Sequence, residues 1–322
     1  MANLFNNPDV LMSSWYALMP SRKLKKGQVK KIVLLDRLIA VFRTEDGQVY
    51  AFDSRCPHLG ADLSRGCVIG NRLRCEFHHW AFEGNGECQE IPYMSDIPKS
   101  AKVFSYPIEE QYGFIWLFNG PHPTFPIPFF KTWNQDHLVP VVLPKMIFNC
   151  YSHIATCNGL DIQHMKSLHN MELLEDPDVK EINEYRIQVK YKIAFTGNSL
   201  MDRITRFFLG KSFILDFMTW SGNMAMGEVP HKDWPILMMF NHIPLTNGGT
   251  QCQPFLFLPK NKIGFLKANY FKIPILLLIS NHFLVDDVGL FNSIKFWPRL
   301  VEKDEPLRLF IQQVNRMSAF KP

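Results

Sequence analysis

Two short segments in the first third of the chain each place a cysteine close to a histidine. Cys56 and His58 lie two residues apart in CPHLGADLSRG, and Cys75 and His78 lie three apart in CEFHHW. Together they form the pattern C-x-H-x16-C-x-x-H. Thiolates and imidazoles are both metal ligands. The spacing therefore predicts one inorganic centre held by two loops.

Two kinds of centre use two cysteines and two histidines. Zinc fingers group like ligands, as C-x2-4-C and H-x3-5-H, whereas here each loop mixes the two. A Rieske-type [2Fe–2S] centre takes both thiolates on one iron and both imidazoles on the other, so the mixed loops favour it. His79 is the alternative to His78 as ligand. Cys67 and Cys88 fall outside the pattern and are expected to be small buried residues.

A second set of possible ligands lies in NGLDIQHMKSLH, which contains Asn158, Asp161, His164 and His169. On an ideal helix the two histidines point about 140° apart. A shared metal therefore requires the helix to bulge or end between them. Two histidines and one carboxylate form the facial triad that holds Fe(II) and leaves positions free for O2.

The carboxylate of such a triad must come from a distant segment. FLVDDVGLFNSI supplies Asp286 and Asp287, which are expected at the start of an amphipathic helix. Both could instead be helix-start charges, which interact favourably with a helix N-terminus.

The elements that position these groups divide the chain in two. Residues 30–53 alternate around EDGQ, which predicts a β-hairpin, and short glycine-separated strands continue to residue 120. Four prolines in GPHPTFPIPFF predict a linker. The remainder mixes strands (YRIQVKYKIAF, PILMMFNHIPL, TQCQPFLFLP) with helices, including 286–300 and 306–320, which predicts α+β structure. The expected division is 1–120, a linker over 121–130, and 131–322.

Composition excludes several other classes of protein. The 322 residues are 47% hydrophobic and 20% charged with a net charge of +5, which indicates a globular protein and no nucleic-acid partner. The apolar run IPILLLIS (273–280) is too short to span a membrane and is expected in the core. The start lacks the features of a secretory signal, and seven cysteines do not indicate a disulfide framework, so a cytoplasmic location is expected.

The two motifs, about eighty residues apart, resemble those of the terminal oxygenase (α) subunit of Rieske non-haem iron oxygenases. The resemblance covers essentially the whole chain. It implies an α+β protein: an N-terminal all-β Rieske domain followed by a helix-grip-like catalytic domain with an antiparallel sheet. It also implies a [2Fe–2S] cluster, a mononuclear Fe(II) and O2 as co-substrate.

The resemblance also implies which residues hold the metals. Asp287, followed five residues later by Asn292, matches the family's third iron ligand better than Asp286 does. The implied cluster ligands are Cys56 and Cys75 on one iron and His58 and His78 on the other, and the implied ligands of the catalytic iron are His164, His169 and Asp287.

Electron transfer and quaternary structure follow from the same likeness. Asp161 matches the carboxylate that bridges a Rieske histidine of the adjacent subunit to an iron-bound histidine, and Asn158 matches the asparagine near the open iron face. A head-to-tail homotrimer is therefore expected. His79 departs from the family, whose members usually carry glycine there, and Asp286 stands where Gln or Glu is common. Both departures leave the ligands in place.

The activity implied is reductive use of O2 to hydroxylate a bulky apolar molecule, polycyclic or steroid-like, as in ketosteroid hydroxylases and cholesterol desaturases. Demethylation or desaturation of an aromatic acid or natural product is the alternative within the family. With no G-x-G-x-x-G and no plant-type ferredoxin motif in the chain, electrons from NAD(P)H must arrive through a separate ferredoxin or flavin reductase. A Rieske electron carrier and a zinc-stabilised binding module are the non-enzyme alternatives.

Overall fold

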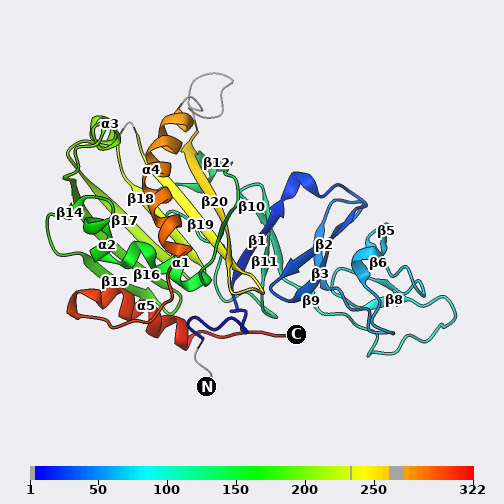
Figure 1. Ribbon diagram of the computed structural model, residues 1–322. Coiled ribbons are helices and arrows are strands. Elements are labelled where there is room, and N and C mark those ends of the chain that lie inside the picture. The colour runs from blue at the N-terminus through cyan, green and yellow to red at the C-terminus, as the bar shows by residue number, and fades with distance from the viewer. Residues whose placement is uncertain (1–3, 233, 261–271) are drawn as a thin grey trace. The chain divides into compact units, whose positions relative to one another are not determined.

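The polypeptide crosses between two separate units at the proline-rich segment. The computed structural model describes residues 4–232, 234–260 and 272–322 (Figure 1). One unit, the N-terminal unit, contains Val10–Ile127 and Ser318–Pro322; the other, the C-terminal unit, contains Met1–Asp9 and Pro128–Met317. The chain passes from one to the other between Ile127 and Pro128, inside the expected linker.

The first residues of the chain belong to the C-terminal unit, and the last residues, Ser318–Pro322, belong to the N-terminal unit. Phe5 stacks on His153 with ring centroids 5.4 Å apart, which ties the first residues to the C-terminal unit. Ser13 N donates to Ser318 O over 2.9 Å, which ties the last residues to the N-terminal unit. Contacts between residues this far apart in sequence leave no signal in local composition.

The N-terminal unit is built from three small antiparallel sheets, as the all-β prediction required. In the second sheet the β3–β4 turn includes Gly47 at φ +104°, the positive angle that glycine tolerates. The strands, sheet by sheet, are β1 (Trp15–Pro20), β11 (Phe114–Phe118) and β10 (Ile108–Gln111); β2 (Val29–Leu34), β3 (Arg37–Arg43), β4 (Val49–Asp53) and β9 (Ser105–Tyr106); and β5 (Cys67–Ile69), β6 (Arg72–Arg74), β7 (Ala81–Phe82) and β8 (Cys88–Glu90).

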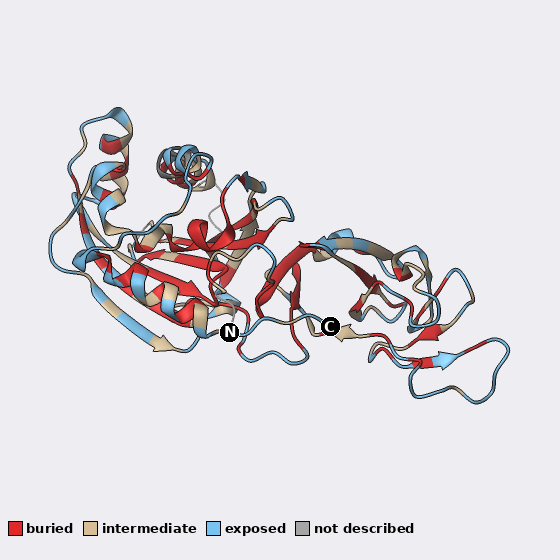
Figure 2. Cartoon of the chain, turned by 60° about the horizontal axis from the view of Figure 1, so that its bottom comes forward, coloured by how far each residue is buried: buried red, intermediate tan, exposed pale blue. Residues whose placement is uncertain are grey.

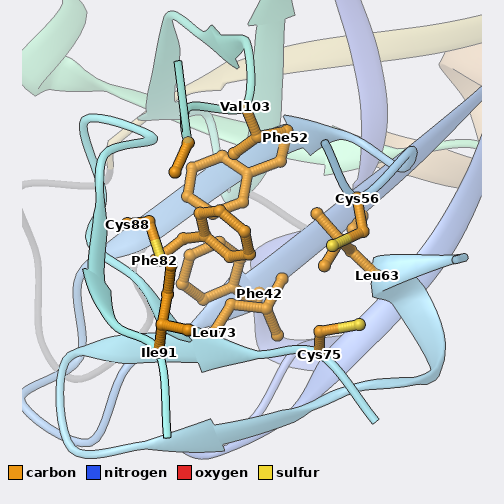
Figure 3. Close-up of a cluster of buried hydrophobic side chains, with 12 residues drawn as sticks. Phe42, Phe52, Cys56, Leu63, Leu73, Cys75, Phe82, Cys88, Ile91 and Val103 are labelled. Atoms are coloured by element: carbon orange, nitrogen blue, oxygen red, sulfur yellow. The ribbon is translucent and has the colours of Figure 1, made fainter. Parts of the chain in front are cut away.

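Aromatic packing forms the core between the second and third sheets. Phe42, Phe52 and Phe82 are completely buried, and the first two meet edge to face with centroids 4.9 Å apart. Burial of each such ring contributes about 1.5–3 kcal/mol. Figure 3 shows Cys56 and Cys75 on one side of these rings. The apolar core thus holds the two ligand loops together.

The C-terminal unit contains a nine-stranded antiparallel sheet in the order β12-β20-β19-β18-β17-β16-β14, with β13 paired to β20 and β15 to β16. Its strands are mostly buried (Figure 2). They are β12 (Leu138–Val142), β13 (Met146–Phe148), β14 (Met171–Leu173), β15 (Asp178–Asn183), β16 (Arg186–Phe195), β17 (Ser212–Trp220), β18 (Met224–Val229), β19 (Ile236–Pro244) and β20 (Thr250–Pro259).

Helices pack on this sheet, and Figure 1 shows α4 lying across it. Leu276 of α4 packs with Met238 of β19 and Leu256 of β20. The α-helices are α1 (Ser152–Cys157), α2 (Ile162–Ser167), α3 (Leu200–Leu209), α4 (Ile273–Phe291) and α5 (Glu305–Arg316), and the 3-10 helix η4 (Asn158–Leu160) joins α1 to α2. Within the described part of the chain, no helix has the length and apolar character needed to cross a bilayer.

The prediction of a helix over 286–300 is wrong in its limits. The helix begins at Ile273, since the apolar run 273–280 is its first half, with Pro274 in its first turn. It ends at Phe291, and Pro298 opposes helix in the segment that follows. Asp286 and Asp287 therefore lie in the last two turns and do not start a helix.

Candidate active site and metal centres

The two cysteine–histidine loops fold into the same turn. In each, the cysteine N–H donates to the carbonyl five residues later, and the cysteine carbonyl accepts from the N–H four residues later. The two distances are 2.9 and 2.9 Å for Cys56, and 2.9 and 3.2 Å for Cys75. The fourth residue after each cysteine is left-handed: Gly60 at φ +75° and His79 at +61°. Glycine is thus the natural occupant of position 79, and histidine is among the residues that tolerate this conformation.

The four donors lie at the tips of these loops. Cys56 and Cys75 are buried, whereas His58 is exposed and His78 half-buried, and the imidazole centroids lie 4.4 Å apart. Trp80 stacks on His58 at 4.6 Å. Burial, with a smaller contribution from the adjacent Cys75, raises the pKa of the Cys56 thiol to about 12. A bound cation is therefore needed to hold thiolates here at neutral pH.

The spacing of these donors separates a two-iron core from a single zinc. Ligands at 2.3 Å from one ion lie at most about 4.6 Å from one another. Among residues 4–232, 234–260 and 272–322, a set of three or more ligand atoms all within 4.8 Å of one another is found only at His164, His169 and Asp287. The cysteine and histidine donors are more widely spread, which fits a [2Fe–2S] core and does not fit one tetrahedral zinc.

The two remaining cysteines of the N-terminal unit have different surroundings. Cys88 is buried, as expected, and lies on the opposite side of the aromatic core from Cys56 and Cys75 (Figure 3). Cys67 is exposed, so the expectation for it is wrong. It lies on the short strand β5, where both end residues face outward.

Asp62 braces the first ligand loop, and the sequence analysis did not single it out. Its carboxylate accepts from Lys31 Nζ at 2.6 Å and from Ser64 N at 3.0 Å. Burial raises the pKa of this carboxyl, but hydrogen bonds from Lys31, Ser54 and Ser64 outweigh it, and the net shift is downward. The local signal is an aspartate directly before a short turn, because Asp is a preferred N-cap residue and its side chain here accepts from Ser64 N.

The second set of ligands lies where helix α2 ends. The helix stops at Ser167, and Leu168 caps it, so His169 lies beyond its end. The requirement that the helix end between His164 and His169 is therefore met, and their ring centroids are 5.1 Å apart. Without the end of the helix the two imidazoles would point to different sides.

Asp287 lies between the two histidines, although it is more than a hundred residues away in sequence. Its Oδ1 is 3.0 Å from His169 Nε2 and 4.0 Å from His164 Nε2. Asp287 is 7% exposed, whereas its neighbour Asp286 is exposed. Asn292 lies away from this group, and its Oδ1 accepts from Asn149 N. Two imidazoles and one carboxylate on one side are the donor set of a facial triad.

Asp161 and Asn158 surround the first histidine. The Asp161 side chain caps α2 by accepting from the N–H groups of Gln163 and His164. The His164 Nδ1 lies 2.5 Å from the Asp161 carbonyl oxygen, which orients the ring and leaves Nε2 free as a ligand. Asn158 Nδ2 is 3.4 Å from that Nε2. Burial lowers the pKa of His164, which favours the neutral, ligating form.

Close packing fixes the turn that carries these residues. A Cβ on Gly159 would lie 2.3 Å from the ring of Phe217 on β17, so only glycine fits without rearrangement. Tyr191 Oη donates to the Gly159 carbonyl at 2.9 Å. The turn between α1 and α2 is therefore held against the sheet from two directions.

The ligand group opens onto a cavity of about 230 Å³ in the C-terminal unit. The sheet contributes one wall, in which alternate residues of β19 face inward, as expected for a strand. The lining side chains of β19 are Ile236, Met238, Phe240 and His242. The helix α4 contributes Ile279, Ser280, Leu284, Asp287 and Phe291. The wall is predominantly apolar.

His242 is a cavity residue that the sequence analysis missed. It is 3% exposed, and burial lowers its pKa to about 3. The only local signal in PILMMFNHIPL is that six successive apolar residues end at the polar pair Asn241 and His242, and the sequence does not say which of the two faces inward. A break in an otherwise apolar inward face is a local indication of a specific polar contact.

Comparison with known proteins matches residues 14–107 to the Rieske [2Fe-2S] domain. Cholesterol 7-desaturase nvd 1 of Ciona intestinalis is 34% identical over 50% of this chain and 35% of the relative. The 4beta-methylsterol monooxygenase of Methylococcus capsulatus is 37% identical over 35% of this chain and 34% of the relative. The chain thus spans about a third of the length of these curated relatives.

Two solved structures share the fold over nearly the whole chain. Dicamba monooxygenase bound to dicamba has a TM-score of 0.68 at 19% identity, covering 95% of this chain and 97% of that one. NdmA of Pseudomonas putida CBB5 with caffeine has a TM-score of 0.67 at 22% identity, covering 93% and 88%.

The matched domain and the fold define the class: a Rieske [2Fe–2S] protein with a second, α+β unit. Residues 14–107 thus form a Rieske [2Fe–2S] domain, and the chain is similar in sequence to a desaturase and a monooxygenase. The two donor sets described above suit a Rieske cluster and a mononuclear iron in residue type and spacing.

Proposed function

We propose that this protein is a Rieske-type oxygenase that uses O2 and externally supplied electrons to hydroxylate a bulky apolar small molecule of sterol-like character. The observation that carries the proposal is the position of His164, His169 and Asp287 at the wall of the apolar cavity. The sterols named for two relatives, cholesterol and a 4beta-methylsterol, support the substrate class.

The proposal assigns the metal ligands as the motifs imply. The bound cluster would supply electrons and the bound ferrous ion would supply a site for O2 reduction. The chain itself excludes bulk water from the reacting end of the substrate, since His169 and Asp287 are buried and the cavity wall is apolar.

We propose Asp161 as the bridge for electrons from a neighbouring subunit, in a head-to-tail homotrimer. One carboxylate oxygen, Oδ1, is engaged by Gln163 N and His164 N. Among the described residues the other, Oδ2, has no hydrogen-bond partner, and it is available to a histidine of another subunit. The electron donor is a separate ferredoxin or flavin reductase. The cysteines other than the proposed cluster ligands are free thiols, which supports a reducing compartment such as the cytoplasm.

Desaturation is the second candidate, because the relative of Ciona intestinalis is named a cholesterol 7-desaturase. It uses the same site and differs in product. A Rieske electron carrier is the non-enzyme alternative, and it gives no role to the triad at the cavity.

The test combines purified protein with a surrogate reductase, NADH, isotopically labelled O2 and candidate sterols, with products identified by mass spectrometry. Hydroxylation adds one labelled oxygen atom to the substrate, whereas desaturation removes two hydrogens and adds no label. If iron analysis finds only the two irons of the cluster and no third iron, the oxygenase proposal fails and the Rieske electron carrier remains.

The matched variants Asp161→Asn and Glu172→Gln test the bridge. Asn keeps the α2 cap, so both metals stay bound while turnover falls at least about 100-fold, the size expected when one catalytic interaction is removed. Glu172 is exposed on β14 and serves as the control. Near-normal turnover in the Asp161 variant would overturn the assignment.

A further inference from the structure

The cavity contains few polar groups apart from the triad and Asn158. Its lining includes His242, Ser280 and the Cys252 thiol, and no lysine or arginine among the described residues. The Ser280 hydroxyl is directed to Met238 Sδ at 3.3 Å. Burial raises the pKa of Cys252, so that thiol is neutral. His242 is therefore the strongest hydrogen-bonding group on the wall away from the triad.

Hydrogen bonding fixes the tautomer of His242. Thr156 Oγ1 lies 2.9 Å from His242 Nδ1 and donates to Ser152 O, also over 2.9 Å. A hydroxyl has a single proton. With that proton on Ser152 O, Thr156 accepts from Nδ1–H, and Nε2 carries the lone pair.

The acceptor nitrogen is left facing the cavity. Nδ1 is bound to α1 by Thr156, and His242 lines the cavity, so Nε2 is the nitrogen on the cavity side. Among the described residues, Nε2 has no hydrogen-bond partner. Burial keeps the imidazole neutral at pH 7, since its pKa is lowered to about 3. A neutral acceptor in an apolar wall neither attracts a carboxylate nor repels an alcohol.

From this geometry we infer that His242 is the positioning residue for the substrate, and that the substrate is a neutral apolar molecule carrying a hydroxyl group that donates to His242 Nε2. The inference rests on the proposed function and narrows it. It favours a hydroxylated lipid such as a sterol over an aromatic acid, because the described residues that line this cavity include no lysine or arginine to pair with a carboxylate. The hydroxyl at His242 holds the apolar body in one orientation relative to the triad.

The experiment measures equilibrium binding of matched pairs that differ by one hydroxyl: cholesterol and its deoxy analogue, and naphthol and naphthalene. Tryptophan fluorescence of the metal-loaded protein reports binding, so turnover is not required. The variants are His242→Phe, which keeps a ring and removes the acceptor, and His242→Gln, which restores a polar group of similar reach. Iron content and circular dichroism are measured for each variant.

Wild type is expected to bind the hydroxylated member of a pair about 10-fold more tightly. His242→Phe should abolish this preference by weakening the alcohol alone, with the hydrocarbon bound within about 2-fold of wild type, and His242→Gln should restore most of it. Equal binding of alcohol and hydrocarbon by wild type, or an unchanged preference in His242→Phe, would overturn the inference. If neither sterol binds but naphthol keeps the preference, His242 retains its role and the sterol substrate fails.

Discussion

Alanine substitutions at the adjacent residues Asp286 and Asp287 should have opposite effects on binding of the mononuclear metal. Asp287 Oδ1 lies 3.0 and 4.0 Å from the two histidine nitrogens. Asp286, about 100° away around the same helix, is exposed. Asp287→Ala should lose the mononuclear metal and keep the [2Fe–2S] spectrum, while Asp286→Ala should keep both.

The size of the effect follows from linkage. A metal at 100 times its dissociation constant stabilises the folded form by about 2.7 kcal/mol. For a unit of about 200 residues, each kcal/mol shifts the melting temperature by about 2–4 °C. Metal addition should therefore raise the melting temperature of the C-terminal unit by about 5–10 °C in wild type and in Asp286→Ala, and leave Asp287→Ala unchanged.

Differential scanning calorimetry with and without ferrous ion under anaerobic conditions measures this shift, and iron analysis counts the metal. Each variant is compared with its own metal-free form, so any loss of the His169–Asp287 hydrogen bond cancels. Retention of the third iron by Asp287→Ala, or its loss from Asp286→Ala, would refute the assignment of the triad.

Three further changes test the packing around the two centres. Gly159→Ala should lower the free energy of unfolding by about 1–3 kcal/mol in urea titrations, because its Cβ meets the Phe217 ring; Phe217→Leu in the same chain should recover part of the loss. His79→Gly should keep the visible spectrum of the cluster and change the free energy of unfolding by less than about 1 kcal/mol, whereas bleaching would make His79 a ligand. Asp62→Asn should be less stable than wild type at pH 7, and the gap should begin to narrow near about pH 4 and close only as the pH falls through the lowered folded-state pKa, because the stability from the ionised carboxyl disappears as it is protonated; a gap that stays constant with pH would contradict this.

Much of the site could be predicted because its information is local. The two ligand loops are fixed by the spacing C-x-H and C-x-x-H, and the need for a helix end between His164 and His169 follows from helix geometry alone. The alternating strands were visible for the same reason. Each of these features depends on residues within one turn or one strand.

Tertiary structure decided what local spacing leaves open. The residues themselves leave Asp286 and Asp287 open, and only the family resemblance favours Asp287. The choice depends on the rotation of α4, which is set by packing of the buried Leu276 against the sheet. That packing turns Asp287 toward the histidines. The inward place of His242 depends likewise on the pairing of β19 with its neighbours. The sequence determined which groups can bind metal. The tertiary structure decided which of these groups come together, because only long-range packing fixes the direction of a side chain relative to a distant segment.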